Sequence, residues 1–153
     1  MFKRILVAID GSGTAAQGFK TALNFARDQA AELNVLHVVD ERGPVMYPEG
    51  GAFVSEMIEL LRESGKKILA QAEQEAAAVG VKCNTLLVET MGLPVAEVIV
   101  GQAKEIPADV IVLGTHGRRG FNRIVMGSDA EGVLREAPCP VLLIRAPEKV
   151  AKS

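Results

Sequence analysis

The sequence predicts an α/β fold in which helices cover one parallel sheet, and three observations support this prediction. Five short runs rich in Val, Ile and Leu alternate with segments whose apolar residues recur at helical spacing. This alternation is typical of right-handed βαβ crossovers. The chain has 153 residues, of which 48% are hydrophobic, and it shows neither a second hydrophobic core nor an internal repeat. A chain of this length can form one core without a metal or disulfide.

Five segments are predicted strands: residues 3–9, 33–39, 81–89, 109–114 and 140–145. The first, fourth and fifth are nearly continuous runs of Val, Ile and Leu, as in parallel strands that are covered on both faces. The third alternates more, through Val81, Cys83 and Thr85, and we therefore expect it to be an outer strand.

Two of four predicted helices follow the first two strands. Apolar residues step by three and four from Phe19 to Leu33, and the same period continues from Val54 to Val79. Residues 40–53, between the second strand and the second helix, are rich in Gly and Pro. A connection of this length is either functional or mobile.

The other two predicted helices lie in the second half of the chain. Pro94 stands at the start of the helix near residues 94–104, where a missing backbone N–H costs least. The last helix begins at Ser128, which forms a capping-box pattern with Glu131, and it ends before Pro138.

Composition excludes several classes of protein. The apolar fraction is too high for a disordered chain, and a net charge of -2 with five Phe, one Tyr and no Trp does not suit nucleic-acid binding. Cys83 and Cys139 lack CxxC spacing, so we expect reduced thiols rather than a disulfide. The first apolar run covers only residues 5–9. We therefore expect a cytoplasmic protein without membrane insertion.

The loop after the fourth strand has the composition of an anion site. Ligands of open α/β sheets bind beyond the carboxyl ends of the strands. From Thr115 to Gly127 there is no acidic residue, whereas three arginines and several glycines stand in or beside this stretch: Arg118, Arg119, Arg123, Gly114, Gly117, Gly120 and Gly127. Glycines allow positive φ and let backbone amides face a phosphate. A flexible surface loop before a Ser N-cap remains the alternative, because neither GxxxxGK[ST] nor GxGxxG is present.

At this loop the chain resembles a known family. Gly114-Thr-His-Gly117, nine further residues and Gly127-Ser128 match G-x2-G-x9-G-[ST], the nucleotide-binding motif of universal stress proteins of the ATP-binding branch. ILVAIDGS, LHVVD and APCPVLLIR, in this order, are also similar to that family. The resemblance covers nearly the whole chain.

The resemblance implies a doubly wound five-stranded parallel sheet in the order 3-2-1-4-5, with four helices. This fold is Rossmann-like and similar to that of the adenine nucleotide alpha hydrolases. Residues 1–147 would form the nucleotide-binding domain and residues 148–153 a charged tail. The implied function is binding of ATP, AMP or ADP as a regulatory ligand in the stress response, with slow or no hydrolysis.

The family's ligand-binding positions carry over residue by residue. Adenosine would lie beside the end of the first strand and the backbone of the second, and the glycine-rich motif would hold ribose and phosphates. The predicted site residues are Ala8, Ile9, Asp10, Val38, Gly114, Thr115, His116, Gly117, Arg118, Gly127, Ser128 and Asp129.

Structural alternatives exist for several of these residues. Asp10 before Gly11 is also a turn former. Ser128 is also explained as an N-cap, and both of its roles can alternate with ligand occupancy. His116 is interpreted as a loop residue that holds local structure, and His37 as a satisfied core residue within a strand.

Asp129 departs from the family pattern, which has an uncharged residue after the Gly-Ser pair. A carboxylate suits the first turn of a helix but repels a triphosphate unless a cation such as Mg²⁺ bridges them. We therefore predict that Asp129 weakens ATP binding relative to AMP or makes it depend on Mg²⁺.

No residue is assigned to catalysis or to metal binding. GxSxG, paired carboxylates and metal-ligand spacing are not found in the sequence. Two alternatives to a regulatory nucleotide-binding protein remain open. One is a slow nucleotide hydrolase or nucleotidyl transferase, and the other is a partner-binding regulator, for example of a transporter, that needs no nucleotide.

The strand from Pro140 to Arg145 would form an apolar sheet edge, which is prone to association unless it is covered. Pairing with the same strand of a second copy would cover it, and the resemblance implies such a homodimer. A short edge protected by Pro140, Arg145 and the charged tail is the alternative.

Overall fold

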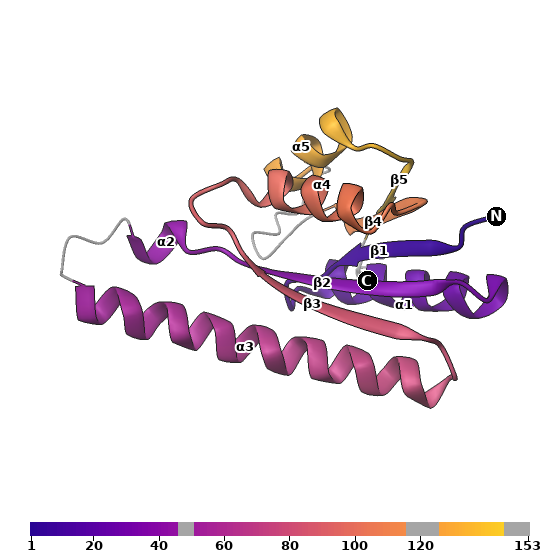
Figure 1. Cartoon of the computed structure of the whole chain (residues 1–153), viewed down its shortest axis with the longest axis horizontal. Coiled ribbons are helices and arrows are strands. Elements are labelled where there is room, and N and C mark those ends of the chain that lie inside the picture. The colour runs from indigo at the N-terminus through magenta and orange to yellow at the C-terminus, as the bar shows by residue number, and fades with distance from the viewer. Residues whose placement is uncertain (46–50, 116–125, 146–153) are drawn as a thin grey trace, which may run out of the picture.

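The computed structural model describes residues 1–45, 51–115 and 126–145 and shows a five-stranded parallel sheet between two layers of helices (Figure 1). The sheet order is β3-β2-β1-β4-β5, so the predicted order is confirmed and the third strand lies at an edge. Its strands are β1 (Arg4–Ala8), β2 (Glu32–Val39), β3 (Cys83–Glu89), β4 (Val110–Gly114) and β5 (Val141–Ile144).

The helices within these residues are α1 (Gly13–Gln29), α2 (Arg42–Val45), α3 (Gly51–Ala78), α4 (Val95–Glu105) and α5 (Ser128–Glu136). The prediction of four helices is wrong because it omits α2. A helix of four residues is too short to show apolar periodicity. The sequence pattern therefore does not predict α2 within the Gly- and Pro-rich connection. None of the helices in the described residues is long and apolar enough to cross a membrane.

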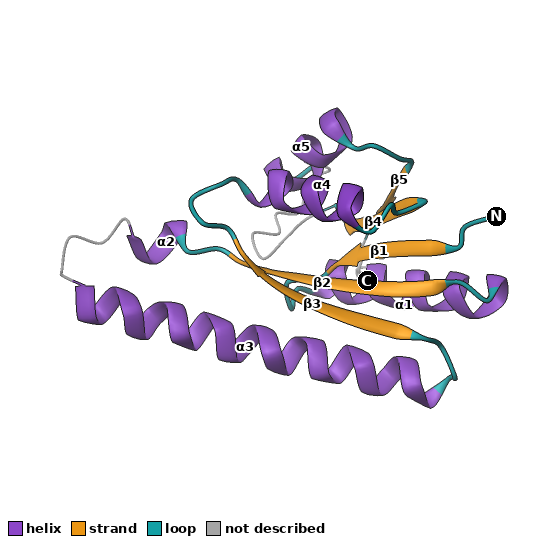
Figure 2. Cartoon of the chain, viewed as in Figure 1, coloured by secondary structure: helices purple, strands orange, loops and turns teal. Residues whose placement is uncertain are grey.

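Helices lie on both faces of the sheet (Figure 2), and each face has its own core of buried side chains. Phe19 and Ala22 of α1 and Leu69 of α3 pack with one set of strand side chains. Ile99 of α4 and Val133 of α5 pack with the opposite set. Consecutive strand residues point to opposite faces, so the near-continuous Val, Ile and Leu runs of β1 and β4 supply both cores.

One helix boundary and the burial of one strand differ from the predictions. Helix α1 ends at Gln29, because Ala30 has φ 52° and ψ 40° and turns the chain out of the helix. Leu33, which fits the helical spacing, is a fully buried residue of β2. β5 forms the second sheet edge, and its four residues are half-buried rather than covered on both faces.

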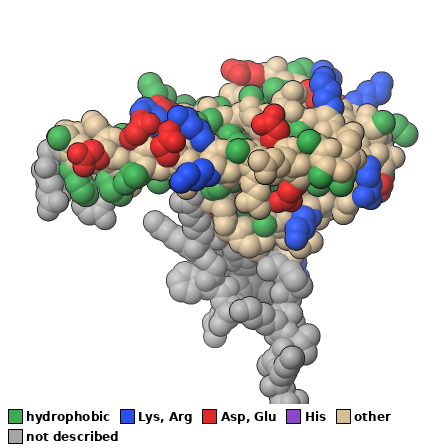
Figure 3. All heavy atoms as spheres, turned by 90° about the horizontal axis from the view of Figure 1, so that it is seen from below, with side chains coloured by type: hydrophobic (Ala, Val, Ile, Leu, Met, Phe, Trp, Pro, Cys, Tyr) green, Lys and Arg blue, Asp and Glu red, His purple; other side chains and the backbone are tan. Residues whose placement is uncertain are grey.

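The long helix α3 extends beyond the carboxyl ends of the strands (Figure 1). Its outer surface carries ion pairs such as Lys66–Glu63 and Arg62–Glu59, and Figure 3 shows acidic and basic side chains intermixed there. The exposed large hydrophobic residues include Phe53 and Leu60 in the first half of α3.

Candidate functional site

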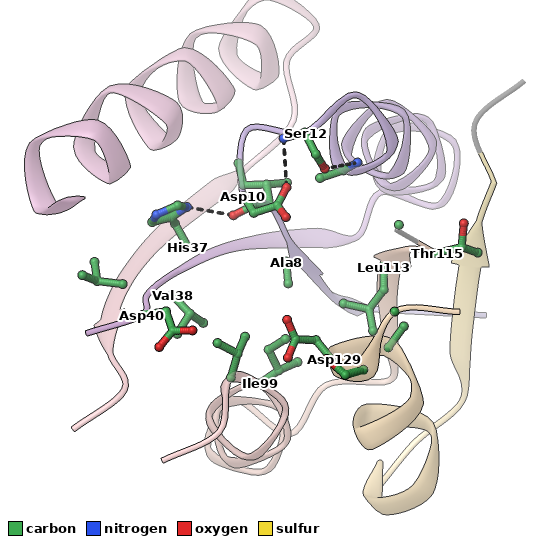
Figure 4. A pocket seen from close by; sticks show the side chains of 18 of the residues that line it. Ala8, Asp10, Ser12, His37, Val38, Asp40, Ile99, Leu113, Thr115 and Asp129 are labelled. Atoms are coloured by element: carbon green, nitrogen blue, oxygen red, sulfur yellow. Dashed lines mark hydrogen bonds between the residues drawn. The ribbon is translucent and has the colours of Figure 1, made fainter. Parts of the chain in front are cut away.

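A cavity of about 480 Å³ lies at the carboxyl ends of the central strands, where α1 and α5 begin (Figure 4). Pockets for small molecules have similar volumes, roughly 300–1,000 Å³. Every predicted site residue that the structure describes lines this cavity: Ala8, Ile9, Asp10, Val38, Gly114, Thr115, Gly127, Ser128 and Asp129. The other predicted residues, His116, Gly117 and Arg118, lie outside the described residues, as do Arg119, Gly120 and Arg123.

Asp10 and Ser12 organise the entry to α1. The Asp10 carboxylate accepts a hydrogen bond from the Ser12 backbone N–H at 2.9 Å, across Gly11, whose φ is +84°. The Ser12 hydroxyl then caps α1 by accepting from the Ala15 N–H at 3.2 Å. The interpretation of Asp10 as a turn former is therefore confirmed, and the same turn brings Asp10 to the cavity wall (Figure 4).

His37 is buried, as predicted for a core residue, yet it also lines the cavity. Its Nδ1 lies 2.8 Å from the carbonyl oxygen of Ile9. Because a carbonyl can only accept, Nδ1 carries the hydrogen. On α3, Gly65 leaves room for the ring, since a Cβ there would lie 2.6 Å from the His37 Cδ2. His37 thus holds the backbone that leads from β1 into the Asp10 turn.

Gly114 is required for packing at the end of β4. A Cβ at Gly114 would lie 2.9 Å from the carbonyl carbon of Thr14 in the first turn of α1. Gly114 has no positive φ, and neither has Gly127, whose φ is -61°. These two glycines therefore do not use the positive φ that glycine allows. Gly114 instead allows the start of α1 to pack closely against the end of β4.

The amino terminus of α5 differs from the predicted capping box. Gly127 is the N-cap and Ser128 is the first helical residue, so the Ser128–Glu131 box is wrong. The backbone sets this start, because the Gly127 N–H donates to Thr115 at 2.8 Å and the Gly127 carbonyl accepts from Glu131 at 3.0 Å. Glycine has no side chain that can accept a hydrogen bond. The N-cap residue of α5 therefore does not bind the first amides of the helix as a Ser or Asp side chain would.

Sequence reasoning missed Asp40 and Arg42, which also line the cavity. The Arg42 guanidinium donates two hydrogen bonds to Asp40, from Nε to Oδ1 at 2.8 Å and from Nη2 to Oδ2 at 2.7 Å. The Asp40 carboxylate raises the pKa of Arg42, and the charge of Asp129 adds to this. The signal available in the sequence was the VVDERGP segment itself, because it follows a strand and the carboxyl ends of parallel strands are where ligands bind.

The cavity combines an apolar wall with a polar rim. Its apolar lining comes from several elements: Val39, Leu61, Val95, Ile99 and Leu113. The charged lining residues that the structure describes are Asp10, Asp40, Arg42 and Asp129. Within the same residues there is no cluster of three or more side chains that could hold a metal ion. The arrangement suits an organic ligand that has both an apolar part and polar groups.

The model of the universal stress protein family matches residues 1–145. The chain belongs to the universal stress protein family. A universal stress protein of Methanocaldococcus jannaschii is 39% identical over 150 residues, which cover 97% of this chain and 85% of the relative.

Solved structures of this family have the same fold. The universal stress protein UspA from Lactobacillus plantarum aligns with a TM-score of 0.81 at 31% identity, over 94% of this chain and 97% of that one. The universal stress protein of Archaeoglobus fulgidus in complex with dAMP aligns with a TM-score of 0.66 at 27% identity, over 93% and 97% of the two chains.

Proposed function

We propose that this universal stress protein binds an adenine nucleotide, ATP, AMP or ADP, in the cavity as a regulatory ligand of the stress response in the cytoplasm. One observation carries the proposal: all the described residues that sequence assigned to the ligand line one cavity, although they come from distant segments. The dAMP complex of the Archaeoglobus relative supports an adenine nucleotide as the ligand.

The chemistry of the cavity supports the two parts of such a ligand. Val38, Ile99 and Leu113 offer apolar surface to an adenine ring. Ser128, at the amino-terminal turn of α5, faces the same space. The backbone N–H groups and the positive dipole end of a helix amino terminus favour a phosphate at such a place.

A magnesium ion would bind together with the nucleotide. The described residues hold no three-ligand cluster, so these residues supply no complete cage for the ion. Mg²⁺ commonly takes one or two carboxylates, phosphate oxygens and waters. Asp129, which lines the cavity, would be the carboxylate, and the ion would offset the phosphate charge.

We infer binding with slow or no hydrolysis, in which the nucleotide shifts a population of states that an unknown protein partner reads. The first experiment is to denature the purified protein and identify co-purified nucleotide by mass spectrometry. Adenine nucleotide in the supernatant supports the proposal. Conversion of loaded ATP to ADP within minutes would instead favour a hydrolase, and absence of adenine compounds would favour an interaction module without nucleotide.

Two variants test whether the nucleotide binds in this cavity. Ala8→Leu adds side-chain volume to the cavity wall, whereas Ala70→Leu adds it to the exposed surface of α3. By isothermal titration, we expect Ala8→Leu to weaken AMP binding by about tenfold or more, since the site loses volume. Ala70→Leu should bind as the wild type does. Equal AMP affinity in both variants would contradict this site.

We also propose a homodimer through β5 and its flanking residues, Pro140 to Arg145. β5 is a sheet edge and its residues are half-buried, so a second copy could pair with it and cover it. Light scattering at micromolar concentration should give twice the monomer mass. A monomer mass with and without ATP would contradict this.

A further inference from the structure

The polar rim of the cavity holds a distinct charge arrangement. Asp40 follows β2, Arg42 begins α2 and Asp129 lies in the first turn of α5, and all three line the cavity. Figure 4 shows the Asp40 and Asp129 side chains at the same cavity. Asp40 comes from the chain after β2 and Asp129 from α5. These three groups together carry one net negative charge.

Arg42 is held by its own neighbour. Besides the two guanidinium bonds to Asp40, the Arg42 backbone N–H donates to Asp40 Oδ1 at 3.1 Å. The pair is partly open to solvent, with side chains 42% and 40% exposed. A guanidinium fork that fits a carboxylate also fits a phosphate. An incoming phosphate can therefore exchange with Asp40 at little geometric cost.

Asp129 acts in the opposite sense. The amino-terminal turn of α5 is where helix physics favours a phosphate, and Asp129 lies in that turn. Each phosphate added to a nucleotide brings further negative charge toward this carboxylate. Repulsion between charges that lie within a Debye length of each other is only partly screened by salt.

We propose that Arg42 and Asp129 together select the phosphate chain, with Arg42 pairing with a monophosphate and Asp129 disfavouring a triphosphate. This inference rests on the proposed nucleotide binding and names its specificity. Asp40 holds Arg42 until the phosphate exchanges with it. The pocket then prefers a nucleoside monophosphate over a triphosphate in the absence of a divalent cation.

The test is isothermal titration of the full chain with adenosine, AMP and ATP in EDTA. We expect AMP to bind about tenfold tighter than ATP, and Asp129→Asn to remove most of this ratio by tightening ATP. Glu131→Gln is the matched control, since Glu131 lies in the same first turn of α5 but does not line the cavity. It should leave the ratio at the wild-type value.

A second variant tests Arg42 separately. Arg42→Gln should weaken AMP by about tenfold and adenosine by much less, because adenosine lacks the phosphate. Arg42→Lys should restore only part of the loss, since an ammonium cannot form the two-pronged contact.

The outcomes separate the two proposals. An ATP-to-AMP ratio that Asp129→Asn leaves unmoved, or that Glu131→Gln shifts equally, would overturn the specificity proposal alone. An AMP affinity that Arg42→Gln does not change would do the same. Failure of the wild type to bind adenosine, AMP and ATP would overturn the proposed function, and the specificity with it.

Discussion

The two ends of the sheet use polar side chains in different ways. At the amino ends of the strands, Asp109 Oδ2 accepts from the backbone N–H groups of Lys3 and Arg4, both at 2.8 Å. Nearby, Glu32 accepts from Lys82 and from Asn84, again at 2.8 Å in each case. At the carboxyl ends, polar groups instead line a cavity.

Chain direction explains this difference. In parallel βαβ units each helix begins near the carboxyl end of a strand, so the N–H ends of α1 and α5 gather at one edge of the sheet. Polar side chains at the amino edge bind one another and hold the termini of elements. We infer that the amino edge serves stability and the carboxyl edge serves ligand binding.

Gly114 lies at the carboxyl edge, yet we expect it to matter for stability as well as for ligand binding. Its substitution should have the largest effect of those predicted here. The glycine lines the cavity, yet Gly114→Ala would set a Cβ 2.9 Å from the Thr14 backbone. Because backbone atoms must move, we expect the free energy of unfolding to fall by about 1–3 kcal/mol. AMP binding should weaken as well, since α1 carries part of the wall. Urea denaturation and AMP titration measure the two effects.

Gly101→Ala is the control for the Gly114 prediction. Gly101 lies on the exposed side of α4, and a Cβ there meets nothing within 4 Å. Alanine favours a helix interior, so we expect a gain of about 0.5–1 kcal/mol in unfolding free energy. If Gly114→Ala is as stable as the wild type, the close approach of α1 to β4 does not limit this position.

The fold was largely predictable, because hydrophobic period and strand composition report on burial. The strands lie within about two residues of their predicted bounds. The place of the cavity was predictable, because the described residues that sequence assigned to a ligand line it, but two parts of its geometry were not. Asp40 and Arg42 meet through local hydrogen bonds, because the Asp40 carboxylate accepts from the Arg42 backbone N–H and guanidinium at the start of α2, a four-residue helix that no periodicity signals. The role of Gly114 depends on contact with α1, which is distant in sequence.

Substitution of Asp109 tests the contribution of the amino edge to stability, and its expected effect on the unfolding free energy is intermediate. The Lys3 and Arg4 amides lower the pKa of Asp109, with the Lys3 bond the larger cause. A lowered pKa stabilises the fold above the unfolded-state value, near pH 4, and this contribution is lost as pH falls through the folded value. Asp109→Ala should lower the unfolding free energy by about 1 kcal/mol at pH 7 and by less in acid.

If the amino edge serves stability alone, Asp109→Ala should leave the affinity for AMP unchanged. Asp28→Asn, on the exposed surface of α1, is the control for loss of one carboxylate. Chemical denaturation at pH 7 and at pH 3 compares the three proteins. A destabilisation of Asp109→Ala that is equal at both pH values would contradict the charge-dependent contribution.

The smallest expected effect concerns backbone strain, which we expect to be similar at the amino edge and at the carboxyl edge of the sheet. Ala30, between α1 and β2 at the amino edge, has φ 52°, and Met91, after β3 at the carboxyl edge, has φ 51°. Both side chains are exposed, so glycine removes little packing. Relief of left-handed strain offsets the entropy that glycine loses, so Ala30→Gly and Met91→Gly should each stabilise by up to about 1 kcal/mol. Ala70→Gly, within α3, should destabilise by about 1 kcal/mol. Stabilisation at only one of the two positions would show that strain, too, differs between the edges.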